Sequence, residues 1–210
     1  TVARLMGQIL FQYGALKGEE FKFVEVSAAD LLSGYVNQTA EQTRKKLEEA
    51  KGGVLFIDEA YALNKKGSNS TGEEAINELL TYMENHRDDI MVIFAGYTKE
   101  MEQFFDINPG FNSRVPHQLT FEDYSPNELL DIFELFCKLN DMRLSSDARD
   151  YLTQYLSKLS NEKSENFANG REMRNLFEKA FTNQANRLSH YNNISDEELN
   201  IIKTEDIIVN

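Results

Sequence analysis

Two runs of consecutive apolar residues constrain the fold more than any other feature of this sequence. One run reads Gly-Gly-Val-Leu-Phe-Ile over residues 52–57, and the other reads Ile-Met-Val-Ile-Phe-Ala over residues 90–95. Such runs are typical of strands that are covered on both faces. An alternating pattern at 21–26 indicates a third strand, and helical patterns at about 39–51 and 73–87 separate the three. Strands that alternate with helices predict an α/β fold with a parallel sheet.

The pattern changes near residue 124. Beyond it, apolar residues recur only at helical spacing, at about 127–139, 146–159 and 171–188. The sequence therefore predicts an α/β core over residues 1–124, followed by a small all-helical domain over residues 125–210.

Serine residues mark the expected starts of two of these helices. Ser125 precedes Pro126, and Ser145 precedes Ser146. A serine hydroxyl can accept a hydrogen bond from an otherwise unpaired amide of the first turn, and proline suits the first helical position. We therefore expect helices to begin at these two points.

Charge and cysteine content exclude several classes of protein. The formal net charge is -13, so the surface field repels phosphate backbones and nucleic acid is not expected as the main partner. Cys137 is the only cysteine, which excludes an intrachain disulfide and a cysteine-based metal site. No apolar run approaches the roughly 20 residues that span a bilayer. We expect a cytoplasmic protein with no membrane partner.

The pair Asp58-Glu59 is the strongest chemical signal in the sequence. Both carboxylates follow an apolar strand, at the edge of a parallel sheet where open α/β folds bind ligands. In an ATPase the first carboxylate can hold Mg²⁺ and the second can polarise the attacking water. The alternative is an acidic pair in a solvated loop.

The segment around this pair resembles a known family. Residues 52–63, Gly-Gly-Val-Leu-Phe-Ile-Asp-Glu-Ala-Tyr-Ala-Leu, resemble the Walker B segment of the AAA+ ATPase branch that contains stage V sporulation protein K and red-type Rubisco activases. Four further segments resemble the same branch in order, at residues 82–89, 93–97, 108–114 and 167–175. The resemblance thus covers nearly the whole chain, which is more specific than a single motif. It implies an AAA+ core followed by a helical lid domain, with ATP and Mg²⁺ as cofactors.

The resemblance also implies catalytic roles. Asp58 would be the acid associated with Mg²⁺, and Glu59 would be the base that orients water. Arg114 would be an arginine finger that reaches the neighbouring subunit's site, where its planar cation neutralises charge on the γ-phosphate. From chemistry alone, a surface arginine after a Pro-Gly turn is a credible alternative, and the match over residues 108–111 makes the finger the better interpretation. The resemblance also implies a short strand at residues 117–121, just after Arg114.

Three further residues match positions that contact nucleotide in the family. Arg171 matches the sensor 2 arginine. Arg174, one turn along, is either a second contact or a residue on the same helix face. Tyr97 stands at the sensor 1 position, where many AAA+ proteins have a polar Asn or Thr. The resembling branch shares this departure, and a packing role is the alternative for Tyr97.

Residues 33–39, Ser-Gly-Tyr-Val-Asn-Gln-Thr, resemble the pore loop that grips a substrate peptide in assembled rings. Tyr35 is the candidate gripping residue and Val36 is its apolar neighbour. The family usually has glycine where Asn37 stands. The structural alternative for Tyr35 is a tyrosine in a buried turn.

The phosphate-binding signature Gly-x-x-x-x-Gly-Lys-Ser/Thr does not occur in the 210 residues. The first residues resemble the helix that follows this loop, so we expect the loop and the central strand before it to lie upstream of Thr1. A chain that begins at Thr1 is expected to bind ATP weakly and to be inactive.

The expected function is that of an ATP-hydrolysing motor that remodels a protein substrate as a homo-hexamer or other ring. The alternative is a non-hydrolysing AAA-like scaffold that assembles with partners. A DNA-acting relative such as a clamp loader fits poorly with a net charge of -13.

Overall fold

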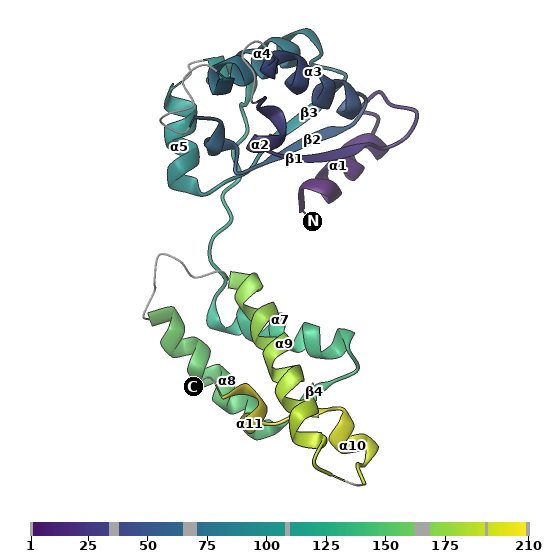
Figure 1. The fold of residues 1–210 in the computed structure, drawn as a ribbon, viewed down its shortest axis with the longest axis vertical. Helices are drawn as coiled ribbons and strands as arrows, with labels where there is room; N and C mark the ends of the chain where they lie inside the picture. Colours follow the sequence, from purple (N-terminus) through teal and green to yellow (C-terminus); the bar gives the residue numbers. More distant parts are fainter. Residues whose placement is uncertain are drawn as a thin grey trace. The chain divides into compact units, whose positions relative to one another are not determined.

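The computed structural model describes residues 2–33, 38–64, 71–107, 110–161, 169–191 and 193–208, with only the backbone described at residues 107, 112 and 161. The chain divides into two compact units, Thr1–Thr120 and Phe121–Asn210. We call them the core unit and the helical unit and describe each by itself. In Figure 1 the core unit runs from purple to teal, and the helical unit runs from green to yellow.

Among the residues that the structure describes, three parallel strands form the sheet of the core unit. They are β1 (Phe23–Ser27), β2 (Val54–Asp58) and β3 (Met91–Phe94), in the order β1-β2-β3. In the central strand β2, the Val54, Leu55 and Ile57 side chains are fully buried. The predicted parallel α/β core is thereby confirmed.

Helices cover both faces of this sheet. The helical segments of the core unit are α1 (Val2–Gln12), α2 (Ala28–Leu31), α3 (Thr39–Ala50), the 3₁₀ helix η1 (Ala60–Asn64), α4 (Thr71–Asn85), α5 (Thr98–Ile107) and α6 (Gly110–Arg114). Helices α3 and α4 lie side by side on one face, and α1 lies on the other (Figure 1). Gly7 lets α1 approach β2 closely, because a Cβ at this position would come within 2.6 Å of the Val54 side chain.

A cluster of phenylalanine rings ties β3 to α5 and α6. The Phe111 ring of α6 is fully buried, 4.8 Å from the ring of Phe104 and 5.4 Å from that of Phe94 between centroids. The Phe94–Phe111 pair is edge-to-face, a favoured aromatic geometry. The cluster anchors the short helix α6 to the sheet.

The helical unit contains α7 (Pro126–Leu139), α8 (Ser146–Asn161), α9 (Asn169–Leu188), α10 (Asp196–Leu199) and α11 (Thr204–Ile207). This confirms the predicted helical domain after the α/β core. Its largest fully buried side chains, Phe133, Leu129, Leu152 and Leu156, come from α7 and α8. Within the described residues, no helix is both long enough and apolar enough to cross a membrane.

The helical unit also contains a short parallel ladder that the sequence did not indicate. Strand β4 (Arg143–Leu144) pairs with β5 (Ile201–Ile202). The buried Gln184 amide of α9 reinforces it by donating hydrogen bonds to the carbonyls of Leu199 at 2.8 Å and Ile201 at 3.2 Å. Two-residue strands carry no recognisable periodicity, which is why the pattern of apolar residues missed them.

The expected start of α7 is confirmed by a capping box. The Ser125 hydroxyl accepts a hydrogen bond from the amide of Glu128, whose carboxylate accepts one from the amide of Ser125 at 2.8 Å. The Glu128 carboxylate also accepts a hydrogen bond from the Ser125 hydroxyl. The bond from the Ser125 amide, and after it the bond from the hydroxyl, lower the pKa of Glu128. The Ser145 hydroxyl caps α8 in the same way, accepting from the amide of Ala148 at 3.2 Å.

One predicted strand is wrong. Residues 117–121 were expected to form a short strand after Arg114, but the structure has no regular element there. A strand requires a neighbour for its amides and carbonyls, and no described strand pairs with this segment. Its apolar side chains Leu119 and Phe121 are correspondingly exposed, at 65% and 72%.

Candidate active site

Asp58 and Glu59 leave the central strand at the carboxyl edge of the sheet. Ile57, just before them, is fully buried, whereas both acidic residues are exposed. The Asp58 carboxylate accepts a hydrogen bond from the Glu59 amide at 3.0 Å. The strand therefore delivers two carboxylates from a rigid, buried element to the edge at which parallel sheets bind ligands.

Glu59 adopts a backbone conformation that side-chain-bearing residues usually avoid. Its φ angle is 49°, in the left-handed region. The next residue, Ala60, is fully buried, and its amide donates to the carbonyl of Ala95 at 3.0 Å. This bond holds the chain as it turns sharply from β2 into η1. Such strain costs on the order of 1–3 kcal/mol and is concentrated at functional sites.

Two tyrosine rings lie beside this turn. The Tyr97 ring, 65% exposed, lies 6.2 Å from the ring of Tyr61 in η1. Gly96 is required here, because a Cβ would come within 2.7 Å of the Tyr61 ring. Burial raises the pKa of Tyr61, and the negative charge of Glu59 raises it further. The structure thus brings Tyr97 to the same sheet edge as Asp58.

Sequence reasoning missed Tyr61. The available signal was its position two residues after Glu59, within the segment that resembled the Walker B motif. An isolated tyrosine in an apolar segment is normally read as part of the core, and only the fold shows it beside Tyr97.

Arg114 ends α6 and is held by neighbouring groups. Its Nη1 donates to the carbonyl of Gly110 at 3.1 Å, and its Nε lies 3.2 Å from a carboxylate oxygen of Glu84 in α4. The side chain is 28% exposed. Among the described residues, these contacts and one with Ser113 are the polar contacts of Arg114, and neither Asp58 nor Glu59 takes part.

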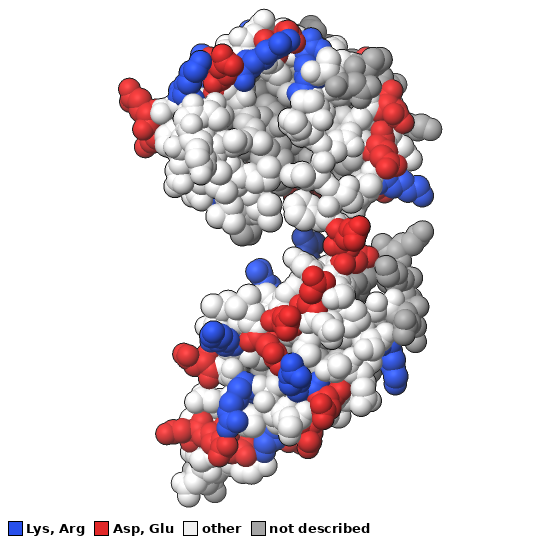
Figure 2. Space-filling view, turned by 180° about the vertical axis from the view of Figure 1, so that it is seen from behind, with Lys and Arg blue, Asp and Glu red and all other residues white. Residues whose placement is uncertain are grey.

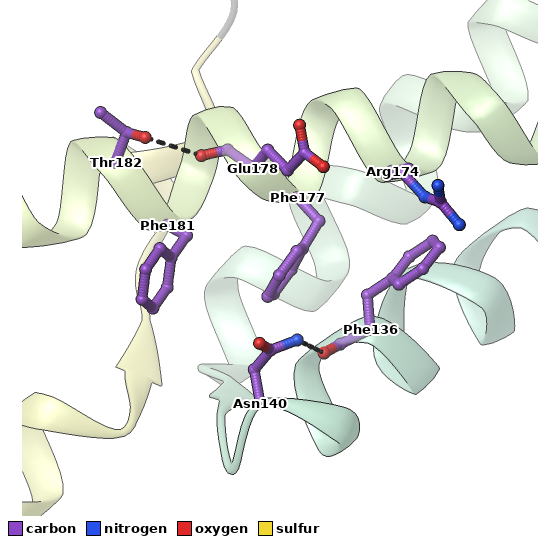
Figure 3. Close-up of a pocket in the computed structure, with 7 residues that line it drawn as sticks. All are labelled: Phe136, Asn140, Arg174, Phe177, Glu178, Phe181 and Thr182. Atoms are coloured by element: carbon purple, nitrogen blue, oxygen red, sulfur yellow. Dashed lines mark hydrogen bonds between the residues drawn. The ribbon is translucent and has the colours of Figure 1, made fainter.

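Arg171 and Arg174 lie near the start of α9, and both are exposed. The Arg174 guanidinium lies 5.7 Å from the centre of the Phe136 ring, a cation–π geometry. Figure 3 shows it at one end of a groove between α7 and α9. The groove is lined by Phe136, Asn140, Arg174, Phe177, Glu178, Phe181 and Thr182. The roles of Arg171 and Arg174 toward nucleotide stay predictions.

The candidate pore-loop residues Tyr35 and Val36 lie outside the described residues, as does Asn37. Their roles stay predictions from the sequence.

The charged groups at the sheet edge fit a magnesium ion bound together with phosphates. In the described part of the chain no three His, Cys, Asp or Glu side chains converge to form a complete metal cage. Mg²⁺ does not need one, because it usually takes one or two carboxylates and completes its shell with water and phosphate oxygens. The exposed Asp58 carboxylate suits that mode of binding.

Acidic and basic side chains are interspersed on the face of the helical unit seen in Figure 2. The ion pairs of this unit include Arg143–Glu197 at 2.6 Å and Arg149–Glu134 at 2.7 Å. Several of the visible positive charges of this unit lie next to negative ones (Figure 2).

Comparison with protein families finds a match for each of the two units. Residues 1–123 match the "ATPase family associated with various cellular activities (AAA)", and residues 125–210 match the "AAA lid domain".

Individual relatives match over almost the whole chain. Stage V sporulation protein K of Bacillus subtilis is 37% identical over 211 residues, which cover 100% of this chain and 65% of that protein. A protein CfxQ homolog of Trieres chinensis is 40% identical and covers 99% of this chain and 71% of its own length. The chloroplastic ribulose bisphosphate carboxylase/oxygenase activase of Cyanidioschyzon merolae is 38% identical, with coverages of 99% and 71%. The chain thus spans about two thirds of the length of these relatives.

Among solved structures, the AAA domain of FIGL-1 in complex with ADP superimposes with a TM-score of 0.58 at 18% identity. The match covers 87% of this chain and 59% of that one. At this identity the likeness shows the fold.

Proposed function

Because the chain belongs to the AAA ATPase family, we propose that its full-length protein hydrolyses ATP and uses the energy to remodel a protein partner. The observation that carries the proposal is the pair Asp58-Glu59. Two exposed carboxylates leave a buried central strand at the ligand-binding edge of the sheet, the second of them in a strained backbone conformation. A solvated acidic loop needs neither the buried strand nor the strain.

In this proposal Asp58 holds Mg²⁺, which neutralises charge on the phosphate oxygens when it is bound. Glu59 accepts a hydrogen bond from the attacking water and orients it toward the γ-phosphate. Both carboxylates are exposed, so each is accessible to a bound nucleotide. Arg171 is the candidate cation from the helical unit.

The remaining parts of the proposal concern assembly and substrate. Arg114 completes the site of a neighbouring subunit, which makes a ring, such as a homo-hexamer, the active form. Tyr35 and Val36 grip an extended segment of the substrate protein. One relative is named as an activase of ribulose bisphosphate carboxylase/oxygenase. We carry over to this chain only the general action on a protein, in the cytoplasm.

The test replaces Glu59 by glutamine in the full-length gene product. Glu59→Gln keeps the size of the side chain but removes the base, so turnover should fall by roughly 10²- to 10⁴-fold while ATP binding persists. Steady-state phosphate release measures turnover, and a fluorescent ATP analogue measures binding.

The matched control is Glu100→Gln, another exposed carboxylate, in the first turn of α5, which follows β3. Its turnover should equal that of the wild type. A Glu59→Gln protein that hydrolyses ATP at the wild-type rate refutes the role of Glu59. A wild-type protein with no ATPase activity refutes the proposed function and favours a scaffold.

A further inference from the structure

Glu84 connects Arg114 to a helix of the core. Arg114 lies on α6, and Glu84 lies near the end of α4, with 3.2 Å between Nε of the arginine and a carboxylate oxygen. The Nε atom is buried and has no hydrogen-bond acceptor among the described residues. The Glu84 carboxylate is therefore the negative charge that compensates this buried part of the guanidinium.

Both partners stand on anchored elements. Helix α4 is fixed by the buried side chains of Leu79 and Tyr82, which are 0% and 4% exposed. Helix α6 is fixed by the fully buried Phe111. The ion pair therefore joins two rigid supports, a condition for holding a side chain in one orientation.

The described polar contacts of Arg114 involve two of its three guanidinium nitrogens. Nε faces Glu84, and Nη1 donates to the carbonyl of Gly110 and to the Ser113 hydroxyl at 3.2 Å. Within the described part of the chain, Nη2 has no hydrogen-bond partner. Because the guanidinium is planar and rigid, fixing Nε and Nη1 also fixes the direction of the Nη2 donors.

The charge around Arg114 favours the binding of an anion. Glu84 pairs with Arg87 as well as with Arg114, so one carboxylate is shared between two guanidinium groups. These three side chains together carry one net positive charge. Glu84 therefore orients Arg114 without cancelling its positive charge.

We propose that Glu84 is a positioning residue for Arg114, holding the guanidinium plane so that Nη2 is presented to a phosphate in the neighbouring subunit's site. This inference rests on the proposed function. It gives a role to the segment at 82–89, which resembled the family without an assigned function. Glu84 itself touches no substrate, so it acts only through Arg114.

The test compares Glu84→Gln with Glu78→Gln in the full-length protein. Both residues lie on α4 and both pair with an arginine, but Glu78 pairs with Arg44 of α3, at 2.7 Å. Glu84→Gln should lower kcat by roughly 10- to 100-fold, because a misplaced catalytic group costs about that much. KM for ATP should stay within about twofold, since Arg114 acts on a neighbour's transition state and not on the binding of a subunit's own ATP. Glu78→Gln should leave kcat unchanged.

Subunit mixing separates positioning from a structural role. Glu84→Gln subunits keep their own Glu59, so combining them with Glu59→Gln subunits, which supply a well-oriented Arg114, should raise turnover above the sum of the two proteins alone. A structural defect would lower turnover in every mixture. If Glu84→Gln does not fold, Glu84→Asp takes its place, with the same change in kcat at constant KM expected.

If the wild type hydrolyses ATP and Glu84→Gln has the same kcat, this inference is overturned and the proposed function stays intact. A rise in KM equal to the fall in kcat, or no gain on mixing, overturns it as well. A wild-type protein that does not hydrolyse ATP overturns both proposals.

Discussion

Asp206 carries a carboxylate into the interior of the helical unit, where only 1% of the residue is exposed. Two hydrogen bonds of 2.9 Å join it to the Arg187 guanidinium, and it also accepts one from the Lys203 amide at 2.8 Å. Asp206→Ala leaves Arg187 with the longer contacts to Glu198 at 3.2 Å and Glu205 at 3.4 Å, so the free energy of unfolding should fall by about 3 kcal/mol. Chemical denaturation followed by circular dichroism measures the change.

The control is Glu197→Ala, which breaks the pair with Arg143. The two side chains of that pair are 75% and 57% exposed, so its loss should cost less than about 1 kcal/mol. Equal losses of unfolding free energy in the two variants would show that burial does not determine how much Asp206 contributes to stability.

At the scale of single residues, the sequence predicted the position and exposure of the acidic pair better than its backbone conformation. Asp58 and Glu59 were found because an apolar strand ends at them, and their exposure at the sheet edge agrees with that reading. The left-handed backbone of Glu59 was not foreseen, because it depends on the hydrogen bond between Ala60 and Ala95 on two different strand ends. The contact of Arg114 with Glu84 was also missed, because it joins two helices that are distant in sequence.

Among the helices, α7 offers the clearest test of a start signal read from sequence. Ser125→Ala removes the hydroxyl that accepts the Glu128 amide and should lower the free energy of unfolding by about 1 kcal/mol at neutral pH. Ser157→Ala is the control, because its exposed hydroxyl donates to a carbonyl inside α8 and alanine favours helix. Urea denaturation should therefore show no loss for Ser157→Ala, and equal losses in both variants would refute the capping role.

The capping box also makes the stability of α7 depend on pH. The folded pKa of Glu128 lies below its unfolded value, so the protein gains stability above the unfolded pKa and loses it as the pH falls through the folded pKa. Ser125→Ala removes part of the cause of that shift. The difference between wild type and variant should therefore shrink when denaturation is repeated below about pH 4.

Whether a helix or strand could be predicted from the sequence depended on its length and on the partners with which it pairs. The long helices α7, α8 and α9 follow from apolar periodicity and from serine caps, both of which are local. Strand β4 is two residues long and exists only because β5 pairs with it. The segment at 117–121 shows the reverse case, since its apolar residues suggested a strand but no described strand pairs with it.

For the assembled molecule, the proposed ring predicts that defects in two different subunits compensate. Pure Arg114→Ala protein should lose turnover by roughly 10³- to 10⁵-fold, the range measured for arginine fingers. Mixed with Glu59→Gln subunits, it should recover activity, because some interfaces then pair an intact Glu59 with an intact Arg114. Phosphate release across a range of mixing ratios measures the recovery.

Two results would contradict this prediction. One is an unchanged rate in pure Arg114→Ala protein, and the other is full activity of a wild-type protein shown to be monomeric by light scattering.

The ladder between β4 and β5 also has a consequence for how the protein is made. The core unit's three strands leave the ribosome in succession, so its sheet can form before the helical unit is complete. Leu144, in contrast, waits for its partner Ile202 until almost all of the helical unit has been translated. At synthesis rates of about 5–20 residues per second, that interval lasts roughly 3–12 seconds. During it the nascent α7, α8 and α9 lack their final partner and stay accessible to chaperones and proteases.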